Sequence, residues 1–108
     1  MIRFLDGPAN GSKLSLERAP MFLRVVIDQA GGIDALDQLY DTMREGETAH
    51  VYELASTVQN VIACTRGHGC RFMAIAEYRL YAKQPSQELL RDNKAWREWA
   101  MGEAAASA

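Results

Sequence analysis

The chain has 108 residues, 48% of them hydrophobic and 24% charged, which is enough for one hydrophobic core and too little for two. Its net charge of -2, from 12 basic and 14 acidic residues, disfavours nucleic acid as a partner, because phosphate backbones attract a dense positive field. We therefore expect a single globular domain spanning residues 1–108.

The sequence predicts neither a membrane span nor export. The most apolar stretch, residues 21–27, is short and contains Arg24, whereas a bilayer span needs about 20 apolar residues. The apolar run at the N-terminus is broken at Asp6 and Gly7, before a signal-peptide core could form. Two cysteines are too few for a secreted disulfide framework. We therefore expect a soluble, cytoplasmic protein with no membrane partner.

Short apolar runs predict strands in the first part of the chain. Residues 2–5 and 13–16 flank a segment rich in Gly, Pro and Asn, which are the residues that form turns. Residues 21–27 follow Pro20, are rich in β-branched and aromatic side chains, and stop at two glycines. We expect three strands here.

The spacing of apolar residues changes between residues 33 and 43. Apolar residues recur there at intervals of three and four, and Asp34 could act as an N-cap. This pattern predicts a short middle helix; the alternative is an irregular segment whose few apolar residues attach it to the sheet. On such a helix Asp34, Asp37 and Asp41 would share one face, which we interpret either as a solvated acidic surface or as a docking site for a basic partner.

The strongest β signal comes from residues 58–64 and 70–81, which predict a hairpin with residues 65–69 as its turn; a further strand is expected at 49–54. If the alternating apolar residues face inward, Cys64 lies opposite Cys70. The set that we assign to the core face of the second arm is Cys70, Phe72, Ala74, Ala76, Tyr78 and Leu80.

The last element is predicted to be an amphipathic helix over residues 86–103. Ser86 is a suitable N-cap, and four apolar residues fall on one face: Leu89, Trp96, Trp99 and Ala100. We expect this helix to pack on the sheet face that carries Phe72. The predicted fold class is therefore mainly β (α+β), a small antiparallel sheet or partly open barrel with a short middle helix and a C-terminal helix.

Cys64, His68 and Cys70 at the hairpin turn form a candidate zinc site, with His50 as a possible fourth ligand. The spacing lacks the tight pair of cysteines found in zinc knuckles. The alternative, which we favour, is that both cysteines are small, reduced core residues and that His68 is an exposed turn residue. A disulfide across the hairpin is geometrically possible, but a reducing compartment disfavours it.

Several longer segments resemble a group of small bacterial and bacteriophage proteins of unassigned function. The resemblance lies in residues 3–9, 19–26, 34–39, 50–52 and 91–99 and covers nearly the whole chain. It implies no activity, catalytic residue or cofactor, although it suggests an association with bacteriophages.

The sequence contains neither a nucleophile elbow nor a metalloprotease helix, so no motif indicates an enzyme or a catalytic residue, although a site can also be assembled in space from distant residues. By elimination, we expect a non-enzymatic protein-binding or assembly module whose partner is another protein or its own copies. A small zinc-stabilised domain is the alternative. A third possibility is an enzyme whose site is assembled from scattered polar residues.

Overall fold

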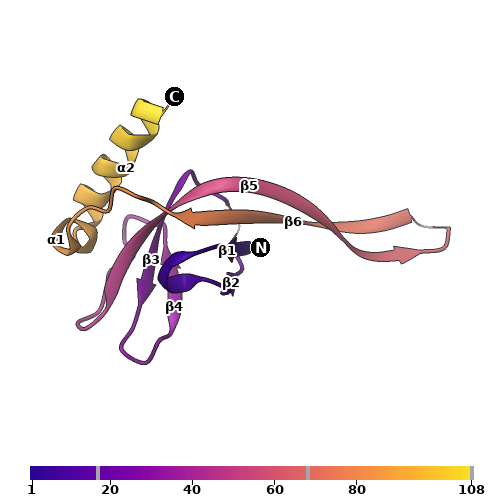
Figure 1. Cartoon of the computed structure of the whole chain (residues 1–108), viewed down its shortest axis with the longest axis horizontal. Coiled ribbons are helices and arrows are strands. Elements are labelled where there is room, and N and C mark those ends of the chain that lie inside the picture. The colour runs from indigo at the N-terminus through magenta and orange to yellow at the C-terminus, as the bar shows by residue number, and fades with distance from the viewer. Residues whose placement is uncertain (17, 68, 108) are drawn as a thin grey trace.

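A computed structural model of the chain describes residues 1–16, 18–67 and 69–107; the side chains of residues 60–63, 65, 71–73 and 107 lie outside the description. Over these residues the fold is a six-stranded sheet followed by two helices (Figure 1). The elements are β1 (Ile2–Phe4), β2 (Lys13–Leu14), β3 (Phe22–Ile27), β4 (Ile33–Leu36), β5 (Thr48–Thr65), β6 (Gly69–Leu80), α1 (Gln87–Arg91) and α2 (Asn93–Ser107).

The sheet has the strand order β2-β1-β6-β5-β3-β4 and is nearly closed. Four of its five strand pairs are antiparallel, and β1 runs parallel to β6. The predicted fold class is thus confirmed in its main features, a mostly β domain resembling a partly open barrel with a C-terminal helix. The one parallel pair makes the sheet mixed rather than purely antiparallel.

Two predicted strands, residues 49–54 and 58–64, are a single strand, β5. A bulge between Leu54 and Ser56 interrupts its register with β6 without ending it. A bulge inserts an extra residue and bends the strand while pairing continues on either side. One long strand therefore serves both the body of the domain and the hairpin that extends from it.

The inner face of the sheet encloses the first core cluster. Its buried members are Ile2, Phe4, Ala9, Leu23, Val25, Ala35, Tyr52, Ala76 and Tyr78. The hydroxyl of Tyr52 accepts a hydrogen bond from the Ala9 amide and donates one to the Asp6 carbonyl, each at 2.9 Å. Gly7 allows this close approach, since its φ is +69° and a Cβ there would lie 2.7 Å from the Tyr52 oxygen.

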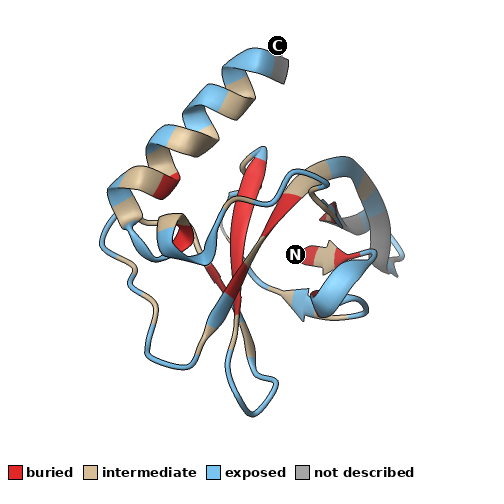
Figure 2. Cartoon of the chain, turned by 60° about the vertical axis from the view of Figure 1, so that its left-hand side comes forward, coloured by how far each residue is buried: buried red, intermediate tan, exposed pale blue. Residues whose placement is uncertain are grey.

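The two helices cover the outer face of the sheet, where a second cluster contains Phe22, Val26, Ala49, Val51, Leu90 and Trp96. Figure 2 shows that buried residues concentrate in the crossing strands and at the start of α2, whereas the far end of α2 is more exposed. The predicted apolar stripe is confirmed, because Leu89, Trp99 and Ala100 also pack against this cluster. The Ser86 side chain accepts a hydrogen bond from the Leu89 amide, as expected for an N-cap.

The predicted helix over residues 86–103 is broken at Asp92, which separates α1 from α2. Asp92 has extended backbone angles, and its Oδ1 accepts hydrogen bonds from the amides of Lys94 and Ala95, each at 3.0 Å. A carboxylate in this position caps the start of a new helix. Beyond the predicted end, α2 continues through Ala104 to Ser107.

Part of the predicted core is corrected. Tyr78 and Trp96 are buried as expected and Trp99 is half-buried, but Ala74 is exposed because it lies beyond Ala76, where the pairing with β1 starts. Phe72 was predicted to be buried, and its side chain lies outside the described residues. Strand β3 is apolar on both of its faces. The face opposite Tyr78 presents Phe22 and Val26, and the two helices cover that face.

The predicted middle helix over residues 33–43 is wrong. Residues Ile33–Leu36 form β4 and pair with β3 in an antiparallel hairpin. The Asp28 carboxylate stabilises the turn by accepting hydrogen bonds from the amides of Ala30, at 2.9 Å, and Gly32, at 2.7 Å. This tight turn brings Ile33–Leu36 next to β3, where the segment pairs as a strand. The helical pattern involves only a few apolar residues, so strand pairing stabilises the segment more than a helix would.

Candidate interaction surfaces

The most prominent feature of the molecule is the projecting end of the β5–β6 hairpin, here called the arm and defined as residues 55–65 and 69–75. Pairing of β5 with β3 ends at Glu53, and pairing of β6 with β1 begins at Ala76. Past these points the hairpin extends from the body as a two-stranded ribbon (Figure 1). Within the described chain, neither residues 55–65 nor residues 69–73 have a strand partner on their outer edge.

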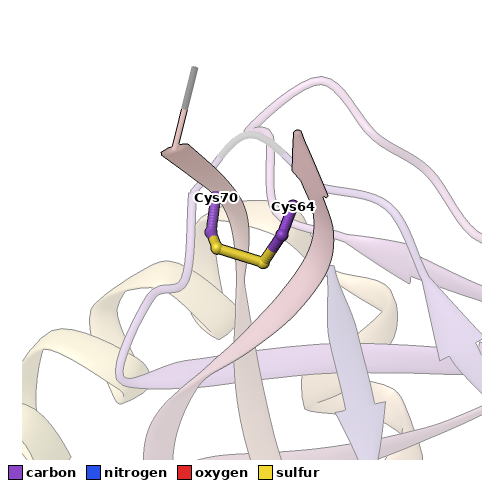
Figure 3. The surroundings of a disulfide bond; sticks show 2 residues. All are labelled: Cys64 and Cys70. Atoms are coloured by element: carbon purple, nitrogen blue, oxygen red, sulfur yellow. A yellow bond between two sulfur atoms is a disulfide. The ribbon is translucent and has the colours of Figure 1, made fainter. Parts of the chain in front are cut away.

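Near the tip of the arm, Cys64 and Cys70 are joined by a disulfide (Figure 3). The predicted register is confirmed, since the two residues are direct cross-strand partners with Cα atoms 3.9 Å apart. The expectation that both cysteines are reduced and lie in the core is wrong, because both are exposed near the tip of the arm and are joined to each other. Direct cross-strand pairing places the two side chains next to each other, which is the arrangement that the disulfide requires.

The candidate zinc ligands are only partly brought together. The disulfide occupies the sulfurs of Cys64 and Cys70, and His68 lies outside the described residues. His50 pairs with Val25 in the body, and at about 3.3 Å per residue it lies roughly 45 Å along β5 from Cys64. His50 therefore cannot complete a site at the tip. Among the described residues, no group of three or more His, Cys, Asp and Glu side chains could hold a metal ion.

An ion pair holds the base of the arm to the N-terminal strand. Arg3 and Glu77 face each other in the parallel β1–β6 pair, and the Arg3 guanidinium donates two hydrogen bonds to the Glu77 carboxylate. The Ser56 hydroxyl donates a third, at 2.9 Å. Hydrogen bonding from Arg3, and then from Ser56, lowers the pKa of Glu77 from its ordinary value.

The three aspartates that were predicted to share a helix face are separated. Asp34 is exposed on β4, and the Asp41 carboxylate accepts a hydrogen bond from the Gln38 amide at 3.0 Å. Asp37 lines a groove beside α2, next to basic residues. The helix face on which the docking prediction rested does not form, because Ile33–Leu36 is a strand.

Arg24 joins the sheet to both helices. Its side chain is fully buried, and its guanidinium donates hydrogen bonds to the Leu90 carbonyl at 2.6 Å, the Asp41 carbonyl at 3.0 Å and Asn93 Oδ1 at 2.9 Å. The guanidinium also lies 5.7 Å from the centre of the Trp96 ring, a cation–π distance. Burial lowers the pKa of Arg24; the nearby Asp41 opposes this effect, and Arg97 adds to it.

A groove runs between α2 and the segment that leads into β3. We call it the α2 groove; it has a volume of about 200 Å³ and is lined by Pro20, Met21 and Phe22 on one side and by Trp96, Ala100 and Met101 on the other. A shallower depression beside it contains Leu39, Tyr40 and Lys94. Arg18 and Arg97 line both hollows.

No protein-family model, curated protein or solved structure matches the chain. No helix in the described part of the chain is both long and apolar enough to cross a membrane.

Several residues of these surfaces were not identified from the sequence. Arg24 was noted only as a charge inside an apolar run, although a lone arginine in a buried strand is itself a signal of a specific buried network. The α2 groove had no comparable signal, because its two walls are separated by more than 70 residues of chain.

Proposed function

We propose that the protein is a non-enzymatic assembly module that binds copies of itself through the arm. The observation that carries this proposal is the ribbon beyond Glu53 and Ala76, whose outer edges have no strand partner among the described residues. An isolated two-stranded ribbon is marginally stable in water, and long open edges promote pairing with another chain. A further strand on either edge would satisfy the unpaired backbone groups.

Charge supports a second copy as the partner. The chain has no acidic residue between Glu53 and Glu77, whereas Arg66 and Arg71 lie near the tip. Two arms that pair edge to edge around a two-fold axis run antiparallel, so the basic tips lie at opposite ends and do not repel each other. Such an interface uses the same surface on both copies and closes at a dimer.

The test is the mass of the protein in solution, measured by sedimentation equilibrium. Gln59 and Ala74 face each other in the ladder, so a two-residue Asn-Gly turn can replace residues 60–73 and shorten the arm while keeping the buried Ile75. We expect the full chain to form dimers and the shortened chain to be a folded monomer. A monomeric full chain, or a shortened chain that still dimerises, would contradict the proposal.

A point variant tests the same interface without deleting any residues. Gln59 is exposed on the arm, and Gln29 is exposed in the β3–β4 turn, far from the arm. In a two-fold dimer Gln59→Lys adds a positive charge to the arm of each copy, so we expect the dimer dissociation constant to rise about tenfold or more. Gln29→Lys adds the same charge away from the arm and should leave the constant unchanged. Equal effects of the two changes would argue against an interface formed by the arm.

A further inference from the structure

Exposed apolar side chains are concentrated around the α2 groove. Of the six large apolar side chains that are exposed in the described part of the chain, four belong to this region: Met21 (47% exposed), Leu39 (58%), Tyr40 (79%) and Met101 (73%). Single exposed apolar residues are ordinary on protein surfaces, whereas a cluster beside a groove is typical of an interaction site. The buried part of the groove lining is also apolar, since it includes Phe22 and Trp96.

Among the residues that the structure describes, the basic side chains around the groove form no ion pair. Arg18, Lys94 and Arg97 line the two hollows, and the ion pair found in the described part of the chain is elsewhere, between Arg3 and Glu77. Arg97 Nε is buried and has no hydrogen-bond acceptor among the described residues. The positive charges of Arg18, Lys94 and Arg97 are therefore open to the carboxylates of an occupant.

A further positive charge, that of Arg24, lies against the groove residue Trp96. Arg24 is fully buried, and the three atoms that accept its hydrogen bonds are uncharged oxygens. Its Nε, like that of Arg97, lacks an acceptor among the described residues. Asp37 and Glu98 also line the hollows, yet neither lies within ion-pair distance of the basic groups in the described structure. Among the described residues, four basic side chains (Arg18, Arg24, Lys94 and Arg97) lie near three carboxylates (Asp37, Asp41 and Glu98), so positive charge at the groove exceeds negative charge by one.

We propose that the α2 groove binds a segment of another protein that carries large apolar side chains next to carboxylates. The apolar side chains would fill the groove between Met21 and Met101, and the carboxylates would accept hydrogen bonds from Arg97, Arg18 and Lys94. The arm of a second copy does not fit this description, because it has no acidic residue between Glu53 and Glu77. In Figure 1 the arm and α2 project from different sides of the body, so this site is separate from the proposed assembly interface.

The test begins with selection of a random peptide library on the immobilised full chain. We expect the enriched peptides to combine large apolar residues with Asp or Glu. Enrichment of peptides without acidic residues, or no enrichment, would overturn the proposal.

The affinity of one enriched peptide is then measured by fluorescence anisotropy against matched variants. Lys94 in the depression and Lys83 outside it are both exposed, so Lys94→Gln and Lys83→Gln remove the same charge at two places. We expect Lys94→Gln to weaken binding about tenfold, Met101→Asp to weaken it at least as much, and Lys83→Gln to leave it unchanged. Equal affinity for all three variants and the wild-type chain would overturn the assignment of the site.

The same variants test for a nucleic-acid ligand, with oligo(dT) as the probe. We expect no binding of oligo(dT) at the salt concentration at which the peptide binds. Binding of oligo(dT) that both Lys94→Gln and Met101→Asp weaken would show that the groove takes a polyanion, and the peptide proposal would be wrong.

Discussion

Replacing Arg24 by methionine should destabilise the domain strongly, because it removes the group that ties β3 to both helices. Methionine retains most of the apolar stem but cannot donate to the Leu90 carbonyl, the Asp41 carbonyl or Asn93 Oδ1. The Leu90 bond is buried and the other two are part-buried. A buried acceptor left without a donor costs about 1–3 kcal/mol, and a lost hydrogen bond to a charged group costs a similar amount. Together these losses predict a destabilisation of about 3–5 kcal/mol.

The measurement is urea denaturation followed by tryptophan fluorescence, since Trp96 and Trp99 both lie in the helix–sheet cluster. For a domain of this size, about 3–5 kcal/mol corresponds to a fall in Tm of at least about 12 °C. Arg79 is exposed on β6, so Arg79→Met is a control for the loss of a surface arginine. If Arg24→Met unfolds within about 1 kcal/mol of the control, the hydrogen bonds of Arg24 are not what holds the helices to the sheet.

Three further predictions concern the inner core, the base of the arm and its tip. Gly7→Ala should lower the free energy of unfolding by about 1–3 kcal/mol, and by more than Gly11→Ala does. Both glycines have a positive φ, but an added Cβ would meet the Tyr52 hydroxyl at Gly7 and open space at Gly11. Equal thermal melts of the two variants would contradict this prediction. The pKa of Glu77, followed by NMR, should lie below its ordinary value and rise in Arg3→Ala. The charged form of Glu77 should add to the free energy of unfolding at pH values above the ordinary pKa of Glu. This contribution should be lost as the pH falls through the folded-state pKa of Glu77. The disulfide closes a short loop, and closing it lowers the chain entropy of the unfolded tip by an amount equivalent to about 2 kcal/mol. Reducing the disulfide should therefore speed up amide exchange near the tip about 30-fold, while the Tm of the body stays constant.

The sequence predicted those elements whose signals are local. Alternating apolar residues identified the long hairpin and the pairing of Cys64 with Cys70, and the Ser86 cap with its apolar stripe identified the C-terminal helices. The break at Asp92 also had a local signal, since Asp favours the cap position of a new helix. These features depend on residues that are close along the chain.

The features that the sequence did not predict depend on residues far apart along the chain. Residues Ile33–Leu36 have a helical spacing, but β3 offers them a partner across a tight turn. The two walls of the α2 groove meet only after the helix has packed on the sheet. The exposure of the two cysteines depends on where the body of the domain ends along the hairpin, which composition does not reveal.

The central claim is that the open edges of the arm pair with those of a second copy. The most direct test is amide hydrogen exchange of residues 55–65 and 69–73 at several protein concentrations, with Gln59→Lys measured alongside. Pairing at the outer edges protects amides that point away from the hairpin, so we predict protection that is present at high concentration, falls on dilution and is reduced in Gln59→Lys. Protection that does not change with concentration would contradict self-assembly through the arm.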